Sequence, residues 1–169
     1  GVARGIVRTD NRSLGISADV AIDEIDACDI LVVPGGFGPR ALETDSRVTD
    51  WIRRIDGTTR ISASVCTGAL LLGAAGLLAG RRANTHWAVR ERLAEFGAIP
   101  VADRVVRDGK IATAAGVSAG IDLALELAIE LAGRDVAAAI QLAAEYDPAP
   151  PLDAGNPERV APEIRARVL

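Results

Sequence analysis

Two short runs of apolar and small residues, each ending in a tight turn, constrain the fold of this chain most strongly. Residues 29–33 (DILVV) lead into Pro34-Gly35-Gly36, and residues 59–65 (TRISASV) lead into Cys66-Thr67-Gly68. Runs of this length bounded by turn residues are typical of buried strands in parallel sheets. Parallel strands need crossover connections, so we expect helices packed against such a sheet.

Helical periodicity follows the first of these strands. The apolar residues that recur at i, i+3, i+4 and i+7 are Val48, Trp51, Ile52 and Ile55. This spacing places their side chains on one face of a helix. Thr44 or Asp45 could cap this helix at its N-terminus, and Gly57 could end it.

Two further helical patterns follow the second strand. Residues from the turn at Cys66 through about Leu78 carry small residues and leucines at helical spacing. A later stripe of apolar residues, which Gly97 could end as a C-cap, consists of Val89, Leu93 and Phe96.

A β-hairpin is predicted in the second half of the chain. Residues 101–107 and 110–114 read as strands, and they flank Asp108-Gly109, a favoured two-residue hairpin turn. Helices are predicted at residues 118–132 and 134–146, with Gly133 between them.

The two ends of the chain are less regular. Residues 6–8 and 15–22 look like short strands that feed the sheet. The tail, residues 147–169, is rich in proline, and we expect an extended arm that ends in a short helix.

Strands that alternate with helices predict an α/β fold. The specific expectation is a three-layer sandwich around a mainly parallel sheet, with one added β-hairpin. A length of 169 residues fits one domain, residues 1–169.

The composition excludes several classes of protein. The net charge is −4 with acids and bases interspersed, so no basic stripe indicates a nucleic-acid partner. The longest apolar stretch, residues 69–79, is too short to cross a membrane, and no signal-peptide pattern opens the chain. Two cysteines without metal-type spacing predict neither a disulfide framework nor a metal site. We therefore expect a reduced, cytoplasmic protein that binds neither nucleic acid nor membrane.

Cys66 is the strongest candidate for chemistry. A side chain at a strand-to-helix corner projects from the carboxyl end of the sheet, where α/β folds bind ligands. Unpaired backbone N–H groups at the start of a helix favour a thiolate and can hold a developing oxyanion. The sequence Ser64-Val65-Cys66-Thr67-Gly68 is similar to the nucleophile elbow G-x-S-x-G of hydrolases. The alternative interpretation is a buried, inert structural cysteine.

Other candidate residues have structural alternatives of the same kind. His86, the only histidine, could be a base paired with Cys66, or a structural residue at a helix entry that bonds to the backbone. Cys28 could be a redox partner of Cys66, although a small buried hydrophobe fits it better. Asp122 lies on one helical stripe with Glu126 and Glu130, which is more typical of a solvated face than of a metal site. A hydrogen bond from Asp122 to the loop around Gly116 would also be compatible with its place in the first turn.

Four segments together resemble the ThiJ/PfpI superfamily, whose scaffold is that of the class I glutamine amidotransferases and is flavodoxin-like. They are ILVVPGG, SVCTGALLLGAAGLLAGRRANTHW, GVSAGIDLALEL and AIQLAAEYDPAPP. Within the superfamily the chain resembles the isonitrile hydratases, whose cysteine adds to the isonitrile carbon and whose product is an N-substituted formamide. The resemblance covers roughly residues 5–151.

The resemblance implies a role for each matching residue. Cys66 would be the nucleophile, and Thr67 would place substrate or water and offer its N–H to the oxyanion. Gly35 and Gly36 would supply facing backbone amides. The loop of residues 114–118 would line the pocket, with Gly116 in it and Val117 as an apolar wall. A homodimer is implied as well, and no cofactor is needed because thiolate, amides and a carboxylate cover the chemistry.

The resemblance also implies a part that this sequence lacks. In the superfamily the first strand and helix precede everything seen here, and they supply a carboxylate near the cysteine. We therefore expect that a first βα unit of roughly 35–40 residues is absent from this chain. Activity of this chain alone is doubtful for that reason.

Three functions remain open on the sequence alone. The first is a cysteine-dependent hydratase or hydrolase, a lyase in the isonitrile case, acting on a small carbon electrophile. The second is a ligand-sensing domain of an AraC-type transcription regulator. The third is a stress protein in which Cys66 senses oxidation.

Overall fold

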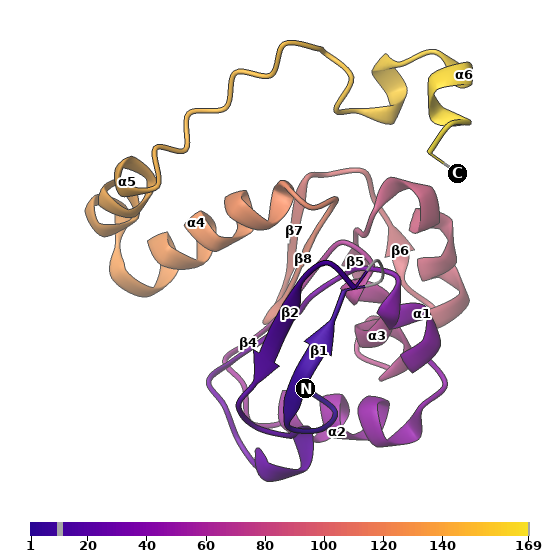
Figure 1. Cartoon of the computed structure of the whole chain (residues 1–169), viewed down its shortest axis with the longest axis vertical. Helices are drawn as coiled ribbons and strands as arrows, with labels where there is room; N and C mark the ends of the chain where they lie inside the picture. Colours follow the sequence, from indigo (N-terminus) through magenta and orange to yellow (C-terminus); the bar gives the residue numbers. More distant parts are fainter. Residues whose placement is uncertain (10–11, 169) are drawn as a thin grey trace. The chain divides into compact units, whose positions relative to one another are not determined.

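The computed structural model describes residues 1–9 and 12–168. The chain forms two compact units, Gly1–Leu123 and Ala124–Leu169, and each is considered by itself. The first unit holds the predicted sheet and Cys66, and the second holds most of α4 (Ala119–Ala132), with α5 (Arg134–Ala143) and the tail (Figure 1).

The central sheet has the strand order β3-β4-β8-β7. Its strands are β3 (Ile30–Val33), β4 (Ile61–Val65), β7 (Val105–Asp108) and β8 (Ile111–Ala114). β4 lies in the middle and is parallel to β3 on one side and to β8 on the other, whereas β7 is antiparallel to β8. The prediction of a mainly parallel sheet with a hairpin is confirmed.

Helices cover one face of this sheet with an aliphatic core. They are α1 (Gly38–Leu42), α2 (Ser46–Asp56) and α3 (Gly68–Ala74). The largest buried side chains of this core include Ile52, Ile55, Leu70, Leu72, Leu78 and Leu93. Asp45 caps α2, since its side chain accepts the N–H of Arg47, and Gly57 is the C-cap, as the sequence predicts.

The opposite face of the sheet receives the start of α4. Val65 points to this face because side chains alternate along a strand, and a Cβ built on Gly120 would lie 3.0 Å from the Val65 side chain. Helical layers on both faces give the expected three-layer α/β arrangement.

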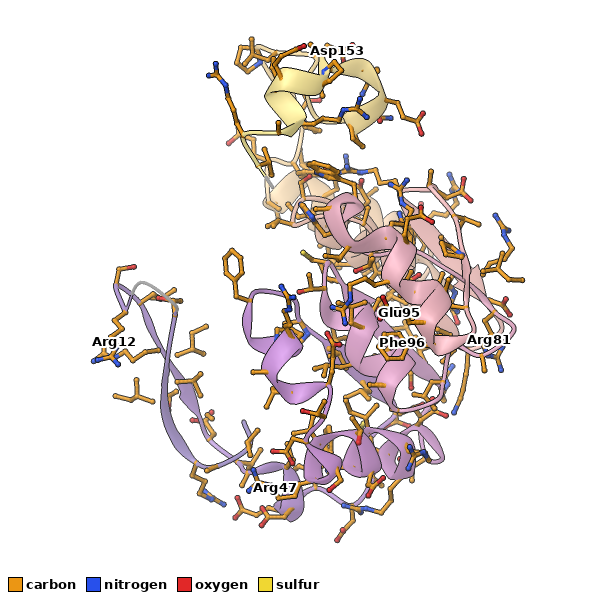
Figure 2. The ribbon with its side chains drawn as sticks, turned by 90° about the vertical axis from the view of Figure 1, so that its right-hand side faces the viewer. Arg12, Arg47, Arg81, Glu95, Phe96 and Asp153 are labelled. Atoms are coloured by element: carbon orange, nitrogen blue, oxygen red, sulfur yellow. The ribbon has the colours of Figure 1, made fainter. Side chains whose placement is uncertain are left out.

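α3 is shorter than predicted. It ends at Ala74, and not near Leu78, because Gly76 adopts a left-handed conformation with φ of 81°. The N–H of Gly76 bonds to Gly73 O and the N–H of Leu77 bonds to Leu72 O, which is the pairing of a Schellman motif. After β5 (Arg82–Ala83), the stripe that contains Leu93 forms the 3₁₀ segment η2 (Trp87–Phe96). Gly97 ends it with φ of 74°. The Phe96 ring, labelled in Figure 2, packs against α3, since a Cβ built on Gly73 would lie 2.7 Å from it.

The hairpin turn lies one residue later than predicted. Asp108 pairs with Ile111 inside the ladder, so the two turn residues are Gly109 and Lys110. Arg81 and the backbone N–H of Arg82 bond the Asp108 carboxylate and hold it in the strand. Gly109 takes the positive φ, 62°, that the first position of this turn requires.

The N-terminal strands do not join the central sheet, contrary to the prediction. β1 (Gly5–Arg8) and β2 (Gly15–Ala18) pair only with each other among the described residues, in an antiparallel hairpin. The hairpin extends away from the helices of its unit, with Arg12 near its tip (Figure 2). Residues 19–22 leave the ladder, and Ile22 begins the short η1 (Ile22–Glu24). A second small pair joins β5 to β6 (Ile99–Pro100) in parallel.

The second unit is largely helical. Gly133 breaks the chain between α4 and α5 with φ of 88°. α5 ends at Ala143, before the predicted Tyr146, because Glu145 turns left-handed with φ of 48° and the N–H of Tyr146 bonds to Gln141 O. The tail contains η3 (Pro157–Arg159) and the short α6 (Pro162–Arg165), in line with the predicted arm.

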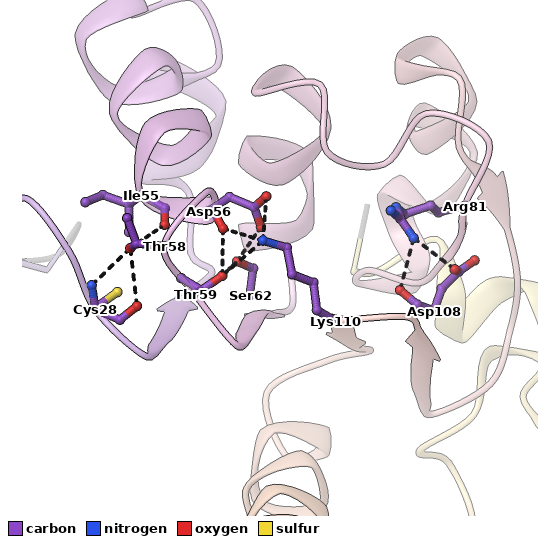
Figure 3. Close-up of polar contacts among 9 residues, drawn as sticks. All are labelled: Cys28, Ile55, Asp56, Thr58, Thr59, Ser62, Arg81, Asp108 and Lys110. Carbon is purple, nitrogen blue, oxygen red and sulfur yellow. Dashed lines mark hydrogen bonds and ion pairs between the residues drawn. The ribbon is translucent and has the colours of Figure 1, made fainter.

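A polar network fastens the hairpin turn to the amino end of β4 (Figure 3). Lys110 Nζ lies 2.9 Å from the Asp56 carboxylate and also donates to Asp56 O, a carbonyl at the end of α2. Ser62 donates to the same carboxylate at 2.7 Å and shares a hydrogen bond with Thr59. Lys110 therefore satisfies a helix end and a half-buried carboxylate together.

Lys110→Met should lower the free energy of unfolding by about 1–2 kcal/mol, because it removes the cation that pairs with the half-buried Asp56 carboxylate and leaves that carboxylate with the Ser62 hydroxyl as its donor. Arg82→Met removes a solvent-exposed ion pair with Asp103 and should cost less than about 0.5 kcal/mol. Chemical denaturation of both variants measures the difference, and equal small losses would contradict the proposed role of the network.

Candidate active site

Cys66 occupies a sharp corner between β4 and α3. Its φ is 56°, in the left-handed region that residues other than glycine rarely adopt. The N–H of Cys66 bonds to Ala114 O at 3.1 Å and Ala115 O at 2.8 Å, and its carbonyl accepts the Thr85 hydroxyl at 2.7 Å. These three hydrogen bonds hold the Cys66 backbone in a strained conformation, which is the geometry of a nucleophile elbow. The side chain is half-buried rather than sealed.

The turn after β3 lies directly against this corner. A Cβ built on Gly35 would stand 2.6 Å from Cys66 Cβ and 2.9 Å from Thr67 N, so only glycine fits there. Thr67 Oγ1 donates to Gly36 O at 2.6 Å and accepts the Gly36 N–H at 2.9 Å. The two turns predicted to form the site are therefore joined by hydrogen bonds.

Those hydrogen bonds affect the predicted oxyanion donors. The Gly36 N–H is engaged with Thr67 Oγ1, so it would have to leave that bond to hold an oxyanion. The Thr67 N–H has no hydrogen-bond acceptor among the described residues. The donor roles of Gly35, Gly36 and Thr67 stay predictions.

The loop after β8 closes the other side of the corner. It begins at Ala115, whose carbonyl accepts the Cys66 N–H, and continues through half-buried Gly116 to Val117, which is 83% exposed. Arg104 braces this loop, because its carbonyl accepts the Ala115 N–H and its guanidinium donates to Ser118 Oγ and to Asp122. Asp122 thus holds Arg104.

His86 lies beside the same loop. A Cβ built on Gly116 would stand 3.5 Å from His86 Cδ2, and among the described residues His86 makes no hydrogen bond to Cys66. Its Nδ1 accepts the Ala88 N–H at 3.4 Å at the start of η2. Burial lowers the pKa of this imidazole, so the neutral ring is favoured, with its proton on Nε2. This geometry matches the structural interpretation, and a catalytic role stays a prediction.

Sequence reasoning missed the buried polar residues that hold the Cys66 corner in place through hydrogen bonds. Thr85 and Asn84 are fully buried, and Asn84 Oδ1 accepts the N–H of Thr85 and the Nε of Arg90. Asn84 N donates to Thr113 of β8. Ser64 is also fully buried, and its Oγ has no partner among the described residues. The consecutive polar residues Asn84, Thr85 and His86 were the one available signal.

Cys28 lies apart from this site, at the other end of β3. Its backbone N–H bonds to Thr58 Oγ1 at 3.2 Å, and burial together with nearby Asp29 raises the pKa of its thiol. A raised pKa keeps this thiol protonated and unreactive at neutral pH.

The described residues offer no other chemical centre. No group of three or more metal-ligating side chains occurs among them, and no helix there is long and apolar enough to cross a membrane. A surface hollow of about 340 Å³ lies beside α2 and is lined in part by Trp51, Arg47 and Arg54. Both arginines are already paired, with Asp45 and Asp26, and no cysteine, serine or histidine lines the hollow.

A strained cysteine at the carboxyl end of a central parallel strand defines a class of protein: α/β proteins with a nucleophile elbow. Residues 3–130 match the DJ-1/PfpI family. The chain belongs to the DJ-1/PfpI family.

Individual relatives agree with this assignment. Isonitrile hydratase from Pseudomonas putida is 45% identical over 171 residues, which cover 94% of this chain and 75% of that protein. The HTH-type transcriptional regulator CdhR from Pseudomonas aeruginosa is 31% identical over 108 residues, 63% of this chain and 32% of the regulator.

Solved structures show the same fold. A ThiJ/PfpI family protein from Pseudomonas syringae has a TM-score of 0.94 and 36% identity, over 99% of this chain and 70% of that one. Schizosaccharomyces pombe DJ-1 has a TM-score of 0.70 over 85% of this chain and 78% of its own, at 22% identity.

Gly68→Ala should destabilise the protein by about 2–4 kcal/mol, because the new Cβ would stand 2.2 Å from Val33 O. The control is Gly38→Ala in the first turn of α1, where no atom lies within 4 Å. Since alanine is the better helix former, this control should be neutral or slightly stabilising. Thermal unfolding of the pair measures the contrast, and a tolerated Gly68→Ala would show that α3 is not packed tightly on β3.

His86→Asn should flatten the dependence of stability on pH. The folded protein favours neutral His86, so the unfolded chain binds more protons as the pH falls below the model-peptide value of 6.5. The free energy of unfolding should therefore fall from pH 7 to pH 5 in the native sequence, and less so in the variant. Asparagine retains an N-cap acceptor, and identical pH profiles would contradict the buried neutral imidazole.

Proposed function

We propose that this chain carries the nucleophile of an isonitrile hydratase, with Cys66 adding to the isonitrile carbon. The observation that carries the proposal is the strained, half-buried Cys66 at the carboxyl end of β4, held there by three hydrogen bonds. The 45% identity to isonitrile hydratase, over 94% of this chain, supports the choice of substrate.

The first chemical step forms a carbon–sulfur bond. The thiolate of Cys66 attacks the terminal carbon of R–N≡C, and a proton is delivered to that same carbon, giving the thioimidate R–N=CH–S–Cys66. The backbone held at φ of 56° fixes the direction of the Cα–Cβ bond, so rotation about that bond is the main motion left for orienting the sulfur.

The second step consumes water and frees the cysteine. Water adds to the thioimidate carbon while the nitrogen takes a proton, and the carbon–sulfur bond then breaks to expel the thiolate. The product is R–NH–CHO, so one water is added overall. Negative charge develops on the water-derived oxygen during the collapse. We assign its stabilisation to the N–H groups of Thr67 and Gly35, joined by that of Gly36 once it leaves Thr67 Oγ1.

The described residues do not supply an evident proton donor beside Cys66. Among residues 1–9 and 12–168, no carboxylate is hydrogen-bonded to Cys66. Asp122 is engaged with Arg104. We therefore assign the proton to solvent water or to a carboxylate supplied from outside this stretch of sequence, as the family resemblance implies. No cofactor enters these steps.

A ligand-sensing role is the second candidate. Two transcriptional regulators are among the relatives, and CdhR is similar over 63% of this chain. The hydratase match extends over 94% of the chain and favours the enzyme. Oxidation sensing by Cys66 is a third, weaker candidate, since a partly exposed thiolate is also oxidised readily. A homodimer stays a prediction.

Cys66→Ala should abolish formamide production from an alkyl isonitrile, a loss of at least about 10³-fold, because no other group can form the covalent bond. Cys28→Ala should keep full activity, since Cys28 precedes β3 whereas Cys66 follows the parallel strand β4, which places them at opposite ends of the sheet. Chromatographic measurement of the formamide distinguishes the two. Full activity of Cys66→Ala would refute the mechanism, and circular dichroism shows whether that variant keeps the fold.

A further inference from the structure

Phe37 stands out among the aromatic side chains of this protein. The chain has only five, and Trp51, Trp87, Phe96 and Tyr146 are all half-buried. Phe37 is 83% exposed, although aromatic side chains usually contribute to folding by being buried. A single exposed apolar residue needs no explanation, so its position relative to Cys66 decides whether it matters.

The backbone that carries Phe37 is tied to the nucleophile turn. Phe37 follows Gly36, whose N–H and carbonyl are both bonded to the Thr67 hydroxyl, and Thr67 is the residue after Cys66. Gly36 itself turns with φ of 127°. Phe37 is the N-cap of α1, with Pro39 in the first turn of that helix. The Phe37 ring is therefore carried by a loop whose backbone is held in place by hydrogen bonds to Thr67.

Val117 presents a second apolar side chain from the other side of Cys66. It is likewise 83% exposed, and it lies two residues after Ala115, whose carbonyl accepts the Cys66 N–H. The loop with Phe37 follows β3 and the loop with Val117 follows β8, which are the two neighbours of β4 in the sheet. Neighbouring strands are about 4.8 Å apart, so the two loops leave the sheet roughly 10 Å from one another with Cys66 between them.

We propose that Phe37, together with Val117, binds the apolar substituent of the electrophile that Cys66 attacks and so determines substrate preference. The inference rests on the proposed function, because it takes Cys66 as the nucleophile. An isonitrile has no hydrogen-bond donor, and its reacting carbon is the same in every substrate. Only the substituent R differs, and apolar contacts are the means of distinguishing one alkyl group from another.

The test uses thiol alkylation, which does not require hydratase turnover. In a Cys28→Ala background, Cys66 is the only thiol, and its second-order rate constants with N-methylmaleimide and N-benzylmaleimide are measured. Phe37→Ala should lower the benzyl-to-methyl ratio about 3–10-fold while the methyl rate changes less than about twofold. Phe37→Leu should retain most of the ratio. Leu142→Ala, which removes an apolar side chain of α5 that is 81% exposed, should leave the ratio unchanged.

Other results would overturn the inference. An unchanged ratio, or equal losses with both reagents, would show that Phe37 does not bind the substituent. A ratio that varies with protein concentration, with altered sedimentation of Phe37→Ala, would assign the ring to a contact between copies of the chain. If the native sequence hydrates no isonitrile, the proposed function fails, but the alkylation ratio still decides the role of Phe37.

Discussion

The structure of the site depends on three hydrogen bonds that hold one residue in an unfavourable backbone conformation. Cys66 donates to the carbonyls of Ala114, at the end of β8, and of Ala115, in the loop after it, and accepts from Thr85. Its φ of 56° would otherwise cost of order 1–3 kcal/mol. The same constraint lies between the end of β4 and the start of α3 and fixes the direction of the Cα–Cβ bond of Cys66. Gly35 lies close to Cys66 and Thr67, and Gly68 lies close to Val33 and Pro34, so the turn after β3 packs directly against this corner.

Function follows from where that corner lies. β4 is the middle of three parallel strands, so loops from both neighbours reach the cysteine. The loop after β3 carries Gly36 and Phe37, and Thr67 is hydrogen-bonded to it. The loop after β8 carries Gly116 and Val117, and the Cys66 N–H is hydrogen-bonded to it. Rigid strands thus position the reactive atom, and the loops set what can approach it.

Much of this could be read from local sequence. The ends of α3 and α5 were missed at local left-handed turns, whereas the errors in strand pairing were long-range. Apolar runs before Pro34 and Cys66 predict both parallel strands and the elbow, because burial and turn chemistry act over a few residues. The turn at Asp108 was placed wrongly, since bonds from Arg81 and Arg82 decide it across 26 residues and more. Strand β2 was extended too far and joined to the wrong sheet for a similar reason, as pairing partners leave no local signal. Thr85 and Arg104 support the site through contacts of this kind.

The central claim is that Cys66 forms a covalent bond to the substrate carbon. An alkyl isonitrile labelled with ¹³C at its terminal carbon, added in excess to the protein, allows the labelled carbon to be followed by NMR. The account predicts a protein-bound thioimidate resonance that disappears when Cys66 is replaced by alanine. Labelled formamide produced equally well by the alanine variant, with no bound resonance in either protein, would contradict it.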